Sequence, residues 1–346
     1  MLEQRPWLKH YRSSIPADID VQQYNSLLEM LEESFKKYAS LPAFSNMGKT
    51  MTYSEIDKLS NQFGAFLQSK GLKKGDRIAI MMPNLLQYPI ALFGAFKAGL
   101  VVVNTNPLYT PREMEHQLTD AGATAIVILE NFAHNLEKIL PKTNIKLIIT
   151  TSIGEMLPFL KRSIVNYVVR NVKKMVPAYS LPAEIKFGKA IADGGKLQLQ
   201  RQTGTHDDVI LLQYTGGTTG VSKGAMLTNR NMIANMLQGA AFMSPFTVEG
   251  KETMLCPLPI YHIFAFTMNV LIPMNGGFHS ILVTNPREIK TVIDTFKKYP
   301  ISMMTGVNTL FNALVNNEDF KKLDFSKLKI AGAGGMALQR VVAEKW

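Results

Sequence analysis

The sequence predicts an α/β protein built on parallel strands. Short apolar runs typical of buried strands alternate along the chain with segments whose apolar residues recur at helical spacing. Such alternation indicates a parallel sheet with crossover helices. The 346 residues are 46% hydrophobic and 19% charged, which is enough for a sizeable core. The predicted strands are residues 75–82, 100–103, 125–129, 147–150, 209–213 and 225–227.

Helices are predicted from spacing and from their start signals. Residues 25–38 carry four apolar residues at helical spacing. Thr52 and Glu55 form a capping box that opens a second helix, which ends near Gly71. Residues 89–98 form an apolar helical segment that Gly99 stops.

Further elements follow toward the carboxyl end. Thr110 and Glu113 form another capping box, with Pro111 at the first helical position. Thr228 is a predicted N-cap. Residues 299–305 read as a strand before a helix opening at 306–311, and 329–335 as a strand running into a glycine turn. That turn also allows a weak Rossmann interpretation, whose acidic partner would lie beyond the chain.

Composition limits the classes of molecule that the protein is expected to bind. The net charge of +11 suits nucleic acid, an anionic membrane or polyanionic small molecules. The lysines are spread along the chain rather than massed with aromatics, so nucleic acid is the weakest of the three. The single cysteine, Cys256, excludes an internal disulfide, and its apolar neighbours predict an inert buried thiol. The N-terminus shows no signal-peptide pattern.

Two stretches bear on membranes. Residues 253–286 contain no charged residue, but their prolines and glycines favour buried strands and helices around an apolar cavity over a spanning helix. Near 155–180, apolar residues at helical spacing are joined by cations without acids: Lys161, Arg162, Arg170, Lys173 and Lys174. This pattern fits a membrane-surface helix or an ordinary surface helix packed on its own domain.

Residues 214–224 hold the strongest chemical signal. Four glycines, four hydroxyls and one lysine lie between two predicted strands. Glycines allow successive N–H groups to face an anion, and Lys223 supplies the compensating charge. A plain linker does not need such a lysine. A Walker A loop requires glycine before the lysine and a hydroxyl after it, whereas Ser222 precedes Lys223 and Gly224 follows.

The stretch resembles the phosphate loop of the acyl-adenylate-forming superfamily, and its Gly-Gly pair is most similar to that of bacterial long-chain fatty-acid–CoA ligases. Residues 52–56, 96–99 and 103–107 resemble earlier motifs of that family in order and spacing. Asn229 departs from the pattern, because many of those ligases carry histidine there. We expect this departure to tune phosphate binding rather than abolish it.

The resemblance implies the fold of the family's N-terminal domain: two mainly parallel sheets with flanking helices. It implies a first α/β subdomain at 1–205, with an N-terminal arm and a basic helical excursion near 155–180. A second subdomain, with the phosphate loop and acyl pocket, spans 206–346. Family members continue to a magnesium-binding glutamate, a ribose-binding aspartate and a C-terminal domain with a catalytic lysine. We therefore expect the C-terminal domain to be missing and this chain alone to turn over very slowly or not at all.

The resemblance also implies roles for individual residues. His262 is expected to orient the acyl carboxylate, and Lys223 to act with it in catalysis. Thr215 is the expected magnesium contact. The expected nucleotide-binding residues are Tyr214, Thr215, Gly216, Gly217, Thr218, Thr219, Gly220, Val221, Ser222, Lys223, Gly224 and Ala225. The expected acyl pocket comprises His262, Phe266, Gly306, Val307, Gly332, Ala333, Gly334 and Gly335. Without the resemblance, a lone histidine at the end of an apolar run, such as His262, would be expected to be a core or capping residue.

The implied activity is ATP-dependent conversion of long-chain fatty acids to acyl-AMP and then acyl-CoA, with Mg²⁺ and with coenzyme A as co-substrate. The implied location is the cytoplasm, with peripheral association with the inner face of the membrane. A homodimer is expected by analogy only. The alternative from another class is a non-catalytic membrane-surface module that binds acyl chains. No nucleic-acid partner is expected.

Overall fold

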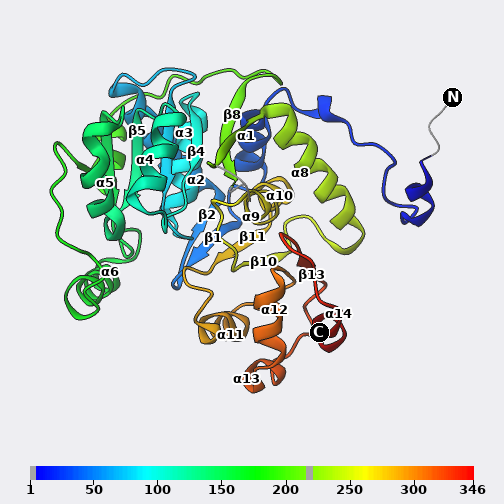
Figure 1. The fold of residues 1–346 in the computed structure, drawn as a ribbon. Helices are drawn as coiled ribbons and strands as arrows, with labels where there is room; N and C mark the ends of the chain where they lie inside the picture. Colours follow the sequence, from blue (N-terminus) through cyan, green and yellow to red (C-terminus); the bar gives the residue numbers. More distant parts are fainter. Residues whose placement is uncertain (1–4, 216–220) are drawn as a thin grey trace.

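Two sheets flanked by helices make up the chain, as the α/β prediction requires (Figure 1). The computed structural model describes residues 5–215 and 221–346. The first sheet has the strand order β7-β6-β5-β3-β4-β8-β9, and the second has the order β13-β12-β10-β11-β1-β2. All neighbouring strands are parallel except the pairs β8–β9 and β1–β2. The strands are β1 Pro42–Asn46, β2 Lys49–Thr52, β3 Arg77–Met81, β4 Val101–Asn104, β5 Ala125–Leu129, β6 Leu147–Thr151, β7 Ile185–Lys186, β8 Val209–Thr215, β9 Lys223–Thr228, β10 Thr253–Cys256, β11 His279–Leu282, β12 Met303–Gly306 and β13 Ile330–Ala333.

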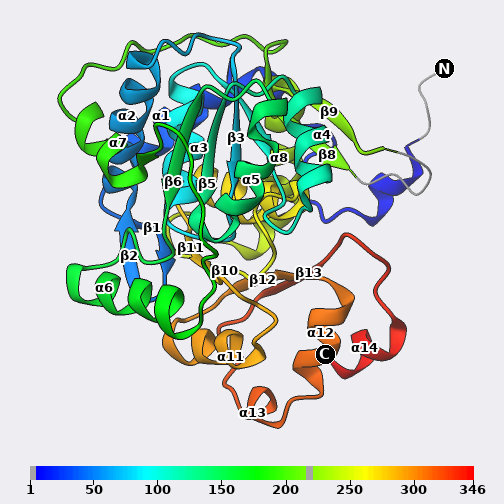
Figure 2. The ribbon, with the colours of Figure 1, turned by 60° about the vertical axis from the view of Figure 1, so that its left-hand side comes forward.

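The helices form layers around the sheets. Helices α4 and α5 pack on one face of the first sheet, and α2, α3 and α7 pack on the other. Helices α11 to α14 cover the outer face of the second sheet (Figure 2). The helices are α1 Leu27–Lys37, α2 Tyr53–Ser69, α3 Gln87–Lys97, α4 Pro111–Asp120, α5 Ala133–Ile139, α6 Phe159–Tyr167, α7 Phe187–Gly194, α8 Asn229–Met243, α9 Ile263–Phe266, α10 Ile272–Gly276, α11 Ile289–Lys298, α12 Asn308–Val315, α13 Glu318–Lys321 and α14 Arg340–Lys345, with π-helical turns η5 Val168–Val172 and η7 Thr267–Leu271.

The predicted start signals are confirmed. Thr52, Thr110 and Thr228 each accept a hydrogen bond from the backbone N–H three residues later, and each belongs to a reciprocal capping box. A hydroxyl at this position satisfies a backbone donor that the helix cannot satisfy itself. Strand β12 begins at Met303, four residues later than predicted, because Tyr299 still caps the end of α11.

The hairpin β1–β2 was not among the predicted elements. Its turn consists of Met47 and Gly48, both with positive φ, which is the backbone twist that two-residue hairpins favour. Strand β1 then pairs in parallel with β11, so an early segment of the chain completes the second sheet. Conversely, β8 and β9 belong to the first sheet. The two sheets therefore do not follow the expected division at residues 205 and 206.

The uncharged stretch 253–286 forms β10, α9, η7, α10 and β11, consistent with the expected buried strands and helices. Cys256 is fully buried, and this burial raises the pKa of its thiol. In the part of the chain that the structure describes, no helix is both long enough and apolar enough to cross a bilayer.

Candidate active site

The carboxyl ends of the parallel strands of both sheets meet through buried amide side chains. Asn84, which follows β3, donates to the carbonyls of Cys256 at 3.1 Å and Leu258 at 2.9 Å. Its oxygen accepts the N–H of Ile260 at 3.0 Å. Because buried polar groups must be paired, these bonds fix the segment after β10 against the first sheet.

A second set of bonds joins the phosphate-loop strand to the same segment. The amide of Gln213, on β8, donates to the carbonyl of Tyr261 at 3.1 Å. Gln213 also accepts a bond from Asn104, at the end of β4, at 3.3 Å. These contacts place the end of β8 beside His262. Ligands of open α/β sheets bind outside the carboxyl ends of strands, so this edge is the candidate site.

The described part of the phosphate loop consists of its two stems. Thr215, the last residue of β8, lies opposite Lys223, the first residue of β9, in an antiparallel ladder. Both side chains are exposed, as are those of Val221 and Ala225. The predicted nucleotide-binding residues Gly216, Gly217, Thr218, Thr219 and Gly220 lie outside the described residues.

Tyr214 and Gly224 lock the base of these stems together. The Tyr214 side chain is buried, and its pKa is raised by this burial and by a hydrogen bond to a carboxylate. A Cβ on Gly224 would lie 2.8 Å from two carbons of the Tyr214 ring. Gly224 is therefore needed because only a hydrogen fits beneath the ring.

His262 precedes α9 at the helix N-cap position. Its ring lies 4.5 Å from that of Tyr261, centroid to centroid, and more than a third of the residue is exposed. Protein atoms around the ring nevertheless lower the pKa of His262 below 6.5 through desolvation. At neutral pH the imidazole is therefore uncharged and can donate one hydrogen bond and accept another.

The expected acyl-pocket glycines lie at the carboxyl ends of β12 and β13. Gly306 is paired with Ala333, and the N–H of Gly334 donates to the carbonyl of Gly306 at 3.2 Å. A Cβ on Gly334 would lie 2.6 Å from the ring of Phe264, which lies on α9 two residues after His262. Val307 borders Gly335, whose φ of +77° favours glycine. The contact of Gly334 with Phe264 thus brings this glycine turn to the segment that follows His262.

Phe266 differs from the other pocket residues. It is fully buried in the main core, and Phe264 rather than Phe266 faces the glycine turn. Periodicity cannot separate the two, because both are aromatic and two residues apart. The role of Phe266 in an acyl pocket stays a prediction.

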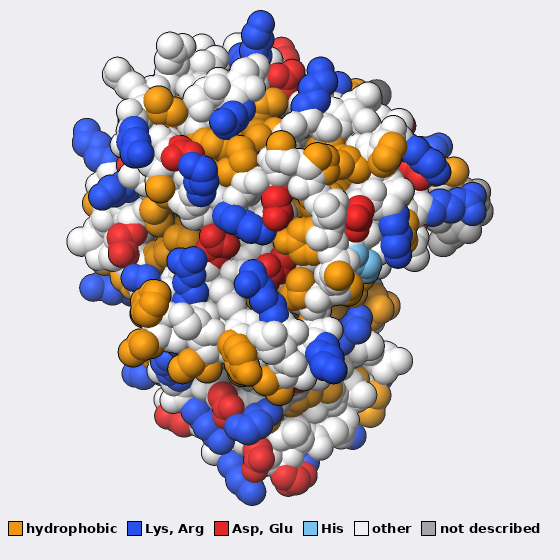
Figure 3. Space-filling view, turned by 90° about the vertical axis from the view of Figure 1, so that its left-hand side faces the viewer, with side chains coloured by type: hydrophobic (Ala, Val, Ile, Leu, Met, Phe, Trp, Pro, Cys, Tyr) orange, Lys and Arg blue, Asp and Glu red, His pale blue; other side chains and the backbone are white. Residues whose placement is uncertain are grey.

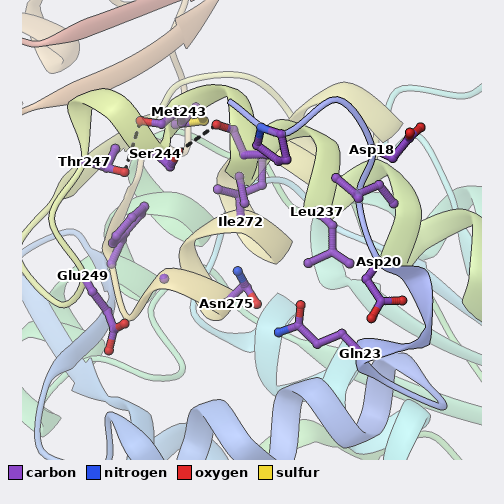
Figure 4. A pocket seen from close by; sticks show the side chains of 16 residues that line it. Asp18, Asp20, Gln23, Leu237, Met243, Ser244, Thr247, Glu249, Ile272 and Asn275 are labelled. Atoms are coloured by element: carbon purple, nitrogen blue, oxygen red, sulfur yellow. Dashed lines mark hydrogen bonds between the residues drawn. The ribbon is translucent and has the colours of Figure 1, made fainter. Parts of the chain in front are cut away.

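Two cavities are lined by residues other than the predicted site residues. One cavity, of about 910 Å³, runs between α6, η5 and α11, and its lining includes Pro257, Pro259 and Tyr261. A second cavity, of about 440 Å³, lies between the N-terminal arm, the end of α8 and α10, with Asp18, Asp20 and Gln23 on one side and Leu237 and Ile272 on another (Figure 4). None of the predicted site residues lines either cavity.

Comparison with known proteins settles the family. The family model described as AMP-binding enzyme matches residues 31–346. The chain belongs to the AMP-binding enzyme family. Within curated proteins, it is 52% identical over 341 residues to a long-chain-fatty-acid–CoA ligase of Salmonella typhimurium and 33% identical over 350 residues to one of Bacillus subtilis. The matches cover 98% and 100% of this chain but 61% of each relative, so the chain spans about three fifths of their length.

Solved AMP-binding enzymes share its fold. A long-chain-fatty-acid–CoA ligase from Archaeoglobus fulgidus matches with a TM-score of 0.77 at 22% identity, over 97% of this chain and 62% of that one. An anthranilate–CoA ligase matches with a TM-score of 0.80 at 18% identity, over 95% of this chain and 59% of that one. The expected fold, an N-terminal domain of the acyl-adenylate-forming type, is thereby confirmed.

Proposed function

We propose that the protein to which this chain belongs activates long-chain fatty acids with ATP and transfers the acyl group to coenzyme A. The observation that carries the proposal is the bond between Gln213 and Tyr261. It holds the stem of the phosphate loop beside His262, while Phe264 of the same segment contacts the glycine turn after β13. The bacterial relatives at 52% and 33% identity are long-chain-fatty-acid–CoA ligases, which supports the same substrates.

The chemistry assigns one task to each group. A carboxylate is a poor electrophile and must first be activated. One of its oxygens attacks the α-phosphorus of ATP, and the bond from that phosphorus to the oxygen bridging to the β-phosphorus breaks. Pyrophosphate leaves. The thiolate of coenzyme A then attacks the acyl carbon, and AMP leaves. Residues 214–225 would hold the β- and γ-phosphates, with Lys223 neutralising charge. The uncharged His262 would orient the carboxylate by donating a hydrogen bond.

Magnesium fits this site only with help from the nucleotide. No group of three His, Cys, Asp or Glu side chains that could hold a metal occurs among residues 5–215 and 221–346. Mg²⁺ commonly uses one or two protein oxygens, phosphate oxygens and water, so the exposed hydroxyl of Thr215 is a suitable single contact. When bound, the ion would neutralise phosphate charge.

We propose that coenzyme A binds in the 910 Å³ cavity. Its inner wall, at Pro259 and Tyr261, ends beside His262, where the thiol must arrive. Two lysines that line this cavity converge: the Nζ atoms of Lys161 and Lys298 lie 3.2 Å and 3.1 Å from the position of a Cβ on Gly48. Among the residues that the structure describes, no carboxylate forms an ion pair with either ammonium. We therefore place the phosphates of coenzyme A at these lysines and its apolar arm along the wall.

The decisive experiment is ATP–pyrophosphate exchange by the full-length protein with a panel of medium- and long-chain fatty acids. We expect exchange that depends on both fatty acid and protein, with the longer chains preferred. The rival function, a non-catalytic acyl-binding module, predicts fatty-acid binding that ignores ATP and no exchange. The absence of exchange with every fatty acid would refute the proposed activity.

We also propose peripheral attachment to the cytoplasmic face of a membrane through the α6 surface, defined as Phe159, Leu160, Ile164, Tyr167 and Val172. These five side chains are between 62% and 79% exposed. The Arg170 guanidinium pairs with Glu130 and ties this segment to the domain, while Arg162, Lys173 and Lys174 are exposed beside it. On the side of the molecule that carries α5 and α6, lysine and arginine side chains are interspersed with hydrophobic ones (Figure 3). Apolar area flanked by cations suits an anionic bilayer.

A homodimer is proposed on the resemblance alone.

Vesicle sedimentation tests this attachment. The triple variant Phe159→Ser, Leu160→Ser, Tyr167→Ser is expected to lower the partition coefficient onto phosphatidylglycerol-containing vesicles by about tenfold or more, since apolar burial is lost. Val341→Ser removes a comparably exposed side chain on α14 and should change nothing. Equal partitioning of the triple variant and the wild type would contradict the proposal.

A further inference from the structure

Helix α4 contacts both described stems of the phosphate loop. It lies beside the β8–β9 hairpin, which carries those stems (Figure 2). The contacts come from His116 and Asp120, which are four residues apart and therefore on one face of the helix. Neither residue was among the predicted site residues, because their partners are about a hundred positions away in the sequence.

His116 holds the stem that leaves the loop. Its Nε2 lies 2.9 Å from the carbonyl oxygen of Ser222, the residue before Lys223. A carbonyl oxygen only accepts, so Nε2 carries the proton in this contact. The side chain is half-buried, which limits competition from water. His116 thus fixes the backbone next to the lysine that the phosphates require.

Asp120 holds the stem that enters the loop. Its Oδ2 accepts the hydroxyl of Tyr214 at 2.5 Å. The Tyr214 ring packs in the same hydrophobic cluster as Met114 and Leu118 of α4, and it covers Gly224 on the other stem. The raised pKa of Tyr214 keeps its hydroxyl protonated at physiological pH, so this donor is always available.

The helix itself is anchored to the sheet. The amide of Gln117 donates to the carbonyl of Asn104 at 2.9 Å, and Asn104 in turn bonds to Gln213 on β8. Its N-terminus is fixed by the capping box of Thr110 and Glu113. A helix held at both ends can impose a fixed separation on whatever it binds, which is the requirement for a preorganised phosphate site.

We propose that His116 and Asp120 are positioning residues that hold the two stems of the phosphate loop at the spacing needed for ATP. This inference rests on the proposed function, since it presumes that the loop binds a nucleotide. The two residues act through Ser222 and Tyr214 and need not touch ATP. Their loss should weaken nucleotide binding and leave the fatty-acid site unaffected.

The test compares variants of the full-length enzyme by ATP–pyrophosphate exchange and by calorimetric titration with ATP. His116→Ala should raise both the KM and the Kd for ATP by about tenfold, because one hydrogen bond at the stem is lost, with the KM for fatty acid unchanged. His116→Gln retains an N–H donor and should recover most of the loss. Glu115→Ala lies on the same helix and removes only the pair with Lys142, so it is the matched control.

Tyr214→Phe supplies an independent variant should His116→Ala fail to fold, since it removes only the hydroxyl that Asp120 binds. It should raise the Kd for ATP without altering the KM for fatty acid.

Unchanged ATP affinity in both folded variants, or an equal rise in both KM values, would overturn the inference. If wild-type enzyme binds ATP but shows no exchange with any fatty acid, the proposed function fails while the titrations still decide the role of α4. If wild type binds no ATP, both fail.

Discussion

Replacing Lys223 by alanine in the full-length enzyme is expected to lower kcat/KM for ATP–pyrophosphate exchange by about two to three orders of magnitude, the range seen when one charge-stabilising group is removed. Lys223 is exposed at the start of β9, opposite Thr215, so its ammonium is accessible to phosphate oxygens. Exchange kinetics measured against ATP concentration provide the readout.

Arg230→Ala is the matched control for Lys223→Ala. Arg230 is an exposed cation on the first turn of α8, close to the loop in sequence but beyond its second stem. It should leave exchange within about twofold of wild type, as expected of a screened surface charge. If Lys223→Ala and Arg230→Ala showed the same exchange kinetics, the proposed role of Lys223 and its loop in phosphate binding would be contradicted.

Replacing Asn84 by alanine should destabilise the protein by about 3–5 kcal/mol, because each buried polar group left without a partner costs about 1–3 kcal/mol. Asn84 is 2% exposed. Its loss leaves the carbonyl of Leu258 and the N–H of Ile260 without the bonds they make with its side chain. Urea unfolding followed by intrinsic fluorescence measures the change.

The same substitution should also impair activity below the unfolding transition. The bonds of Asn84 fix the segment that leads to His262, so its imidazole would lose its place beside β8. Asn171→Ala removes an exposed asparagine whose amide bonds only to the carbonyl of Tyr167, and it should be neutral in both assays. An Asn84→Ala protein as stable and as active as wild type would show that the buried amides do not hold the two sheets in register.

Local signals predicted most of the elements, because the physics that sets them is local. The capping boxes at Thr52, Thr110 and Thr228 involve residues three positions apart, and the central strands β3, β4 and β5 of the first sheet are mainly apolar runs. The contacts of His116 with Ser222 and of Phe264 with Gly334 join distant segments, and no periodicity encodes them. The resemblance to a known family could therefore predict the individual residues of the candidate site. The contacts that support those residues could be found only in the structure.

The hairpin β1–β2 shows the same limit in the fold. Residues 42–52 form two short segments that mix polar and apolar residues. They become strands because β1 can pair with the edge of β11. The basic segment after β6 is a helix, as its spacing predicts. Its spacing could not show which side chains stay exposed, because exposure depends on the neighbouring surface.

The pairing of β1 with β11 has a consequence for biosynthesis. Asn46 bonds to the carbonyl of Leu282, 236 residues further along the chain. On the ribosome, the hairpin therefore emerges long before the strand that will receive it, and the second sheet stays unfinished until that strand is translated. During this interval the edge of β1 is open to wrong partners. Chaperones that shield nascent strands should therefore matter more for the second sheet than for the first, in which β3, β4 and β5 form from residues 77–129.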